Sequence, residues 1–94
     1  MLPAPLYKGL QIKVSRKAAR ELLHHNTDLN DVVEILESGY DCAPSKRAEN
    51  IIERCLRRGN AEIRVVVAKV TVKYPDGFVE EVWRLIHFGI TKRR

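Results

Sequence analysis

Two turn signals separate three β-rich stretches in the second half of the chain, and they constrain the fold more than any other feature. Gly59-Asn60 joins stretches 50–58 and 61–74, and both of its residues tolerate the positive φ of a two-residue hairpin turn. Pro75-Asp76-Gly77 joins the second stretch to 78–90, because proline sets the first corner and glycine supplies a positive φ. These signals predict antiparallel strands, with the β-branched stretch 61–74 in the centre.

The first half of the chain has a helical period instead. Residues 10–14 alternate as a half-buried strand does, and Ser15 then caps a helix predicted over 16–25, which Asn26 closes. Asp28 caps a second helix over 28–38, and the glycine after it is the stop signal. Tyr40 to Ala43 is a candidate short strand, and Pro44 to Arg47 a loop.

These elements predict one α+β domain. The N-terminal strand and the two-helix hairpin are expected to pack on one face of a three- to four-stranded antiparallel sheet. A chain of 94 residues supplies one modest core. We expect an extended or disordered lead-in over 1–9, the domain over 10–92 and a basic tail at 93–94.

The turns also predict the strand register. A Gly59-Asn60 hairpin places Arg57 opposite Glu62 and Ile52 opposite Val67. A three-residue loop at 75–77 places Val67 opposite Leu85, whereas a two-residue turn shifts the third strand by one residue and reverses its faces. The phase of the apolar alternation changes after Val67, which predicts a β-bulge near Ala68.

The register separates a core face from an open face. With the three-residue loop, the core face receives Trp83, Leu85 and His87 in addition to Ile52, Leu56, Ile63, Val65 and Val67. The open face receives Arg84, Ile86 and Phe88 in addition to Arg57 and Arg64.

The positive charge is unevenly distributed. The whole chain carries +5, but residues 1–45 have five basic and six acidic groups, whereas residues 46–94 have twelve basic and six acidic groups. Arginine offers a planar fork that fits phosphate oxygens and stacks on bases, and Phe88 offers a stacking surface. The predicted RNA-binding set is Arg57, Arg64, Arg84, Phe88, Lys92 and Arg93; the alternative is a solvated sheet face with a basic tail.

Other chemistry is sparse in the sequence. The serines are expected at helix caps or turns. His24 and His25 are favoured at the negative end of the helix dipole, and as adjacent helical residues their side chains point about 100° apart. His87 is either a core or edge histidine or a proton-transfer group. No metal or cofactor motif is present, and no apolar run approaches the length of a membrane span. Cys42 and Cys55 are expected as two free thiols in a reducing cytoplasm, since no export signal is seen.

Two stretches carry a family resemblance. Residues 26–39 (NTDLNDVVEILESG) and 84–90 (RLIHFGI) resemble the second helix and last strand of RelE/ParE-like toxins, and the chain is most similar to BrnT-like and related uncharacterised small domains. The resemblance covers about residues 10–92. It implies a RelE-like fold, mRNA cleavage that is often ribosome-dependent, and neutralisation by an antitoxin. Related families often begin the first helix with a His-Ala pair, where this chain has Lys17-Ala18.

These observations lead to two functional hypotheses. The first is an RNA-interacting RelE-like domain, with metal-independent, toxin-type mRNA endoribonuclease activity as its candidate reaction. His87 or Tyr40 would then be the base for the 2′-hydroxyl, and Arg84, with its neighbouring arginines, the cation for the phosphate. The partners expected are RNA or the ribosome and an antitoxin-like protein. The second is a non-catalytic protein-interaction or dimerisation module, which includes a homodimer through an exposed strand edge.

Overall fold

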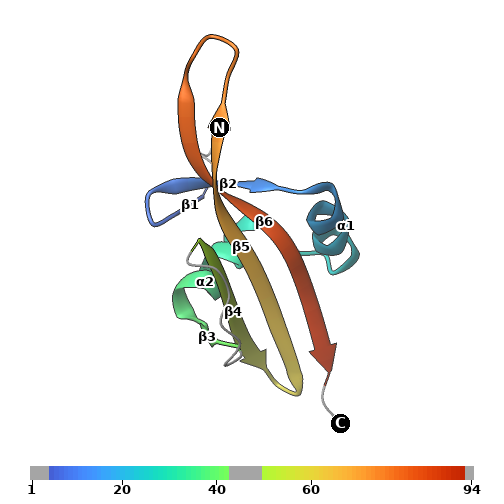
Figure 1. The fold of residues 1–94 in the computed structure, drawn as a ribbon. Coiled ribbons are helices and arrows are strands. Elements are labelled where there is room, and N and C mark those ends of the chain that lie inside the picture. The colour runs from blue at the N-terminus through green and yellow to red at the C-terminus, as the bar shows by residue number, and fades with distance from the viewer. Residues whose placement is uncertain (1–4, 43–49, 93–94) are drawn as a thin grey trace.

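A single mixed sheet runs through the part of the protein that the structure describes, which is residues 5–42 and 50–92 of a computed structural model (Figure 1). Its six strands lie in the order β1-β2-β6-β5-β4-β3. The elements are β1 (Leu6–Tyr7), β2 (Leu10–Val14), α1 (Arg16–His24), α2 (Leu29–Ser38), β3 (Tyr40–Asp41), β4 (Ile51–Arg58), β5 (Ala61–Lys73) and β6 (Val79–Lys92). The α+β class is confirmed. The sheet has more strands than the three or four expected, and it is not wholly antiparallel.

The additional sheet structure lies at the N-terminal side. β1 and β2 form a hairpin, and β2 pairs in parallel with β6, so that Lys13 lies opposite Arg84 and Val14 opposite Leu85. Within the segment expected as a lead-in, Tyr7 is buried, and its carbonyl accepts a hydrogen bond from Trp83 Nε1 at 3.0 Å. The two aromatic rings also pack, with centroids 5.6 Å apart. This pairing joins distant parts of the chain, for which no local turn signal exists.

The helices begin and end where their capping residues predict. The Ser15 hydroxyl accepts from the Ala18 amide at 3.1 Å, and Asp28 and Asp31 form a reciprocal capping box. Asn26 has a φ of 52°, which allows the sharp exit from α1. Gly39 ends α2 where space is short, since a Cβ there would lie 2.5 Å from the carbonyl oxygens of both Cys55 and Ile35.

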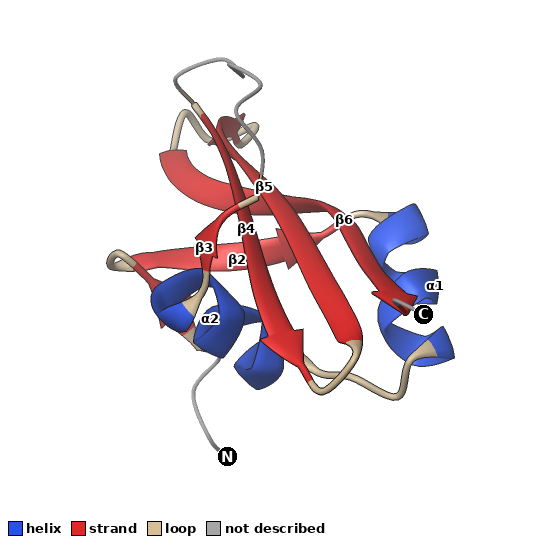
Figure 2. Cartoon of the chain, turned by 90° about the horizontal axis from the view of Figure 1, so that it is seen from below, coloured by secondary structure: helices blue, strands red, loops and turns tan. Residues whose placement is uncertain are grey.

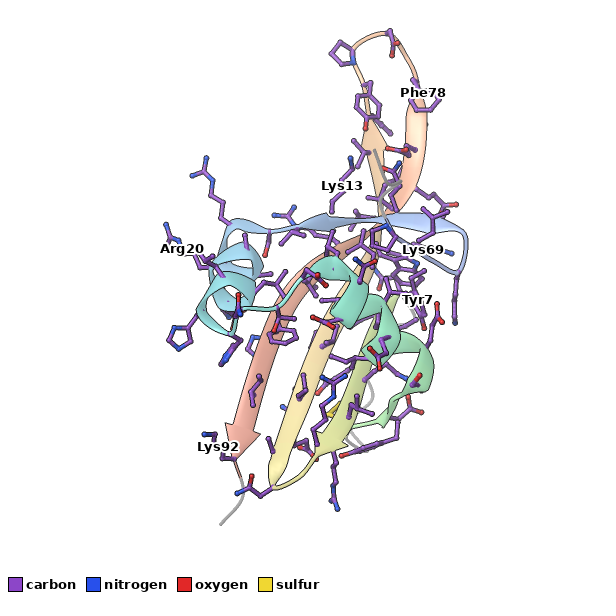
Figure 3. All side chains as sticks on the ribbon, turned by 180° about the vertical axis from the view of Figure 1, so that it is seen from behind. Tyr7, Lys13, Arg20, Lys69, Phe78 and Lys92 are labelled. Carbon is purple, nitrogen blue, oxygen red and sulfur yellow. A yellow bond between two sulfur atoms is a disulfide. The ribbon has the colours of Figure 1, made fainter. Side chains whose placement is uncertain are left out.

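Both helices cover one face of the sheet, as the view from behind shows (Figure 3). The core they form with it contains Ala18, Leu22, Val32, Ile35, Leu36, Ile63, Val65, Val67, Leu85 and Phe88. Burying such side chains contributes roughly 1.5–3 kcal/mol each. The helices therefore pack on the sheet as predicted, whereas the N-terminal strand β2 joins the sheet beside β6 and does not pack on its face.

The predicted register is confirmed in its main points. Arg57 faces Glu62, Ile52 faces Val67, and Val67 faces Leu85. The Tyr74 amide donates to the Phe78 carbonyl at 2.8 Å, which closes the three-residue loop 75–77. The ladder shifts between Val66 and Val67, so the predicted β-bulge exists, with Ile86 as the extra residue on β6.

That bulge reverses the expected faces of two residues beyond it. Val66 faces His87 and Val65 faces Phe88. Phe88 is therefore in the core, 1 % exposed, and not on the open face as expected. His87 is half-buried and lies on the open side, where Phe88 was expected. Trp83 and Leu85 are buried, and Arg84 and Ile86 are exposed, as predicted.

The β5–β6 hairpin projects beyond the rest of the sheet (Figure 1). β4 pairs with β5 only as far as Ala68, and β2 pairs with β6 only from Trp83 to Leu85. Within the described residues, 70–73 of β5 and 79–82 of β6 therefore pair only with each other. We call residues 70–82 the arm. The predicted loop at Pro44 to Arg47 lies outside the described residues.

Candidate functional site

The sheet face opposite the helices carries most of the polar side chains of the central strands. We call it the open face. It is formed by Tyr40 of β3, by Glu53, Cys55 and Arg57 of β4, by Glu62, Arg64 and Val66 of β5, and by Arg84, His87 and Gly89 of β6. Helix α1 lies along the β6 side of this face (Figure 2).

His87 makes the most specific polar contact at this face. Its Nδ1 lies 3.0 Å from Glu21 Oε2 of α1, and the two side chains are 36 % and 22 % exposed. The other oxygen of Glu21, Oε1, accepts a hydrogen bond from the Phe88 amide at 3.3 Å. Glu21 therefore spans α1 and the free edge of β6, and its orientation is fixed at both oxygens. A carboxylate at Nδ1 holds one tautomer of an imidazole and leaves Nε2 with its lone pair.

Gly89 provides the space that this imidazole occupies. A Cβ at Gly89 would lie 2.8 Å from His87 Nε2, closer than van der Waals contact permits. Nε2 therefore lies over the backbone of Gly89, on the open face. The His87 side chain is 36 % exposed, so part of the ring is open to a bound molecule.

One row of residues crosses the sheet beside this histidine. Gly89 faces Arg64, Arg64 faces Cys55, and Cys55 faces Tyr40 on successive strands. Arg64 is 46 % exposed, and its Nε lies 3.3 Å from Glu53 Oε2. The guanidinium is thus held in place while part of it faces solvent.

The two candidate bases are far apart. Tyr40 lies three strands from Gly89, which corresponds to about 14 Å at ordinary strand spacing. Its hydroxyl donates to Glu62 Oε2 at 2.7 Å. His87 and Tyr40 therefore belong to opposite sides of the open face and do not meet at one reacting atom.

The other predicted residues are also dispersed. Arg57 lies 4.0 Å from Glu62, and because the Arg57 side chain is 60 % exposed this pair adds little stability. Arg84 lies opposite Lys13 on the other side of the bulge from His87. Phe88 is buried and offers no stacking surface, although its ring packs 5.7 Å from that of His25. Lys92 is exposed at the end of β6, and Arg93 lies outside the described residues.

Helix α1 supplies basic residues that sequence reasoning missed. Arg16, Lys17 and Arg20 are all exposed, and Lys17 lies one helical turn before Glu21 on the same side of α1. The signal was present in the sequence, since residues 1–20 carry five basic groups and no acidic group. A charge sum over residues 1–45 does not show these basic groups, because the acidic groups from Glu21 onward cancel their charge.

The two cysteines form a disulfide, and the expectation of two free thiols is wrong. Cys42 and Cys55 are bonded, and Cys55 is fully buried beneath the open face. β3 pairs with β4 at Tyr40–Cys55, which brings Cys42 close to its partner. Neither residue is available as a nucleophile or metal ligand while the bond is intact.

Within residues 5–42 and 50–92, no group of three histidine, cysteine or acidic side chains could hold a metal ion. No helix in the same ranges is long and apolar enough to cross a membrane. The Ser15 hydroxyl is a helix cap, as predicted.

Comparisons with known proteins do not assign this arrangement to a family. No family model, no curated protein and no solved structure gave a significant match to the chain.

Proposed function

We propose that this protein binds RNA and cleaves it without a metal ion, in the manner of a RelE/ParE-like toxin, with His87 as the general base. The observation that carries the proposal is the contact of His87 Nδ1 with Glu21 at 3.0 Å, with Nε2 over the Gly89 backbone. An imidazole oriented in this way can accept a proton at Nε2.

The reaction is a transfer within the RNA strand. Nε2 of His87 removes the proton from a ribose 2′-hydroxyl, and the 2′-oxygen forms a bond to the adjacent phosphorus. The bond from phosphorus to the 5′-oxygen breaks, and that oxygen takes a proton from water. The products are a 2′,3′-cyclic phosphate and a 5′-hydroxyl. Glu21 is a positioning residue, since it contacts the imidazole and not the RNA.

Cations on both sides of His87 support an RNA ligand. Arg64 lies opposite Gly89 on β5, and Lys17 lies one turn from Glu21 on α1. A phosphodiester over His87 would then be near a guanidinium and an ammonium, both of which stabilise developing negative charge. Arg57 and Lys92 extend the cationic surface along the strands. Lys17 occupies the position at which the resembling families often have a histidine.

A cleavage assay tests the proposal. End-labelled cellular RNA is incubated with the purified protein in EDTA and low salt, and the products are analysed for cyclic phosphate ends. We expect cleavage by the wild type and its loss in His87→Gln. His24→Gln is the matched control, because His24 is exposed on α1 and its loss should have no effect. Absence of cleavage by the wild type, on free RNA and on translating ribosomes, would contradict the proposal.

Two associated proposals concern partners and location. An antitoxin-like protein as a partner is tested by asking whether a short acidic reading frame adjoins the gene and whether its product abolishes cleavage. We also propose the cytoplasm as the location, because RNA is the ligand. Because disulfides are rare in reducing compartments, cell fractionation tests this location, and recovery of the protein in an exported fraction would contradict it.

The second candidate function is a non-catalytic interaction module. It is favoured by one observation, the exposed apolar side chains of the arm, among which Phe78 is 58 % and Val79 53 % exposed. The absence of salt-sensitive RNA binding and of RNA cleavage would support this function over the first.

A further inference from the structure

One face of the arm carries most of its valine and aromatic side chains. Val70 faces Val82, Val72 faces Glu80, and the Tyr74 amide bonds to the Phe78 carbonyl. Because side chains alternate along a strand, Val70, Val72, Tyr74, Phe78, Glu80 and Val82 share this face. Tyr74 and Phe78 are 37 % and 58 % exposed, and their rings pack with centroids 5.6 Å apart.

The base of this face is a basic hollow. It has a volume of about 280 Å³ and is lined by Lys13, Val14, Val70, Val72, Val82 and Arg84. It lies in the corner where the arm leaves β2, and Figure 3 shows Lys13 pointing from β2 toward the arm. Among the described residues, neither Lys13 nor Arg84 has an ion-pair partner.

The tip of the same face is acidic and aromatic. Glu80 accepts a hydrogen bond from the Tyr74 hydroxyl at 3.0 Å, and this bond is the main cause that raises the pKa of Tyr74. Asp76 is exposed in the loop, where its Oδ1 accepts from the Phe78 amide at 3.0 Å. The tip thus offers two rings and two carboxylates, and the base offers an apolar floor with two cations.

We propose that two copies of this chain associate through their arms, packed face to face and antiparallel, with the tip of each arm in the basic hollow of the other. Val72 lies midway between Val70 and Tyr74, so a two-fold axis near Val72 places each tip over the opposite base. Such an interface is isologous, because the same surface serves on both copies. The inference does not depend on the proposed RNA cleavage, and it uses no residue of the Glu21–His87 pair.

Charge complementarity selects a second copy as the occupant. Asp76 and Glu80 of one copy approach Lys13 and Arg84 of the other, while valines and aromatic rings fill the space between them. RNA is disfavoured on this face, because its phosphates would meet Asp76 and Glu80. Apolar residues with charges at the margin are also the usual composition of a specific protein interface.

Sedimentation equilibrium of matched variants tests the proposal. We expect a dimer for the wild type, and at least a thirtyfold increase in the dimer dissociation constant for Phe78→Ser. Val79→Ser is the control: Val79 is similarly exposed but lies on the other face of the arm, so the dimer should persist. Circular dichroism checks that both variants fold. A monomeric wild type up to about 1 mM, or equal weakening by both substitutions, would overturn the proposal.

Two further variants test the antiparallel arrangement. Glu80→Arg and Arg84→Glu should each weaken the dimer at least tenfold, and the double variant should restore most of the affinity. A thiol-specific cross-linker that spans about 10 Å should join two copies of Val72→Cys, whereas Thr71→Cys, on the opposite face, should not be joined. Additive losses in the double variant, or equal cross-linking at both positions, would rule out this arrangement.

Discussion

Glu21 of α1 and His87 of β6 form a contact of 3.0 Å that depends on the whole fold. The two residues come from a helix and a strand at opposite ends of the chain. The second Glu21 oxygen binds the Phe88 amide, so one carboxylate both orients the imidazole and satisfies a backbone donor at the edge of the sheet.

Glu21→Gln tests the orienting role of this carboxylate. A glutamine can keep its oxygen at the Phe88 amide, but its NH₂ group would then donate to His87 Nδ1 and place the imidazole proton on Nε2. We expect RNA cleavage to fall by about 10²-fold or more, because Nε2 could no longer accept a proton. The ¹⁵N chemical shifts of the imidazole show which nitrogen carries the proton. The same tautomer in Glu21→Gln and in the wild type would show that Glu21 does not orient His87.

Gly89→Ala tests the space that His87 requires. The new Cβ would lie 2.8 Å from Nε2, so the imidazole must rotate away from Glu21. Because the obstructing atom ends a side chain, we expect a stability change below about 1 kcal/mol but a large loss of cleavage. Binding of Gly89→Ala to an uncleavable RNA with a 2′-deoxy group at the scissile position should match that of the wild type. A loss of binding as large as the loss of cleavage would show that Gly89 acts independently of His87.

Reduction of the Cys42–Cys55 disulfide should destabilise the protein. The bridge closes a loop with a sequence separation of 13, for which the chain-entropy model gives about 3 kcal/mol. In a domain of this size that corresponds to roughly 15 °C in Tm. Thermal unfolding with and without dithiothreitol measures the effect, and Cys42→Ser should unfold like the reduced wild type. Thiols that react with an alkylating reagent in the native, unreduced protein would contradict the pairing.

Asp28→Ala should remove the cap of α2. Asp28 Oδ1 accepts from the Asp31 amide at 3.0 Å, and the Asp28 amide donates to Asp31 at 3.4 Å. Loss of this box should lower the free energy of unfolding by about 1 kcal/mol in a denaturant titration. Asn30→Ala, an exposed position in the first turn of the same helix, is the control. A cost at Asn30 as large as that at Asp28 would indicate general helix effects.

Stability should decline at alkaline pH because of Tyr7. Burial is the main cause that raises the pKa of Tyr7 above its ordinary value of 10.0, and the nearby Arg54 opposes it in part. The fold thus favours the neutral phenol, so its contribution is complete below pH 10 and is lost as the pH rises through the higher folded pKa. Tyr7→Phe should decline less between pH 9 and 11 than the wild type. Parallel curves for the two proteins would exclude Tyr7 as a cause.

The sequence predicted the elements that depend on neighbouring residues. The hydrogen bonds of Ser15, of Asp28 and of the turn at 75–77 join residues only three or four positions apart, so the local sequence predicts them. The parallel pairing of Lys13 with Arg84 and the Glu21–His87 contact join segments with no shared local signal. His87 was identified as a candidate, but Glu21, Lys17 and Gly89 acquire a role only when α1 lies against β6. The sequence did not predict the disulfide, because the prediction of two free thiols rested on the expected cellular compartment and not on the distance between the two cysteines.

The extra residue in β6 has a consequence for how this strand tolerates a change in length. Ile86 is the unpaired residue between the rows of Leu85 and His87. Deletion of this one residue would leave a regular ladder in which His87 still faces Val66 and Phe88 still faces Val65. Regular pairing with Ile86 retained would instead turn the imidazole into the core and expose the aromatic ring, so the loss of one codon is tolerated here where a slip of one residue in pairing is not.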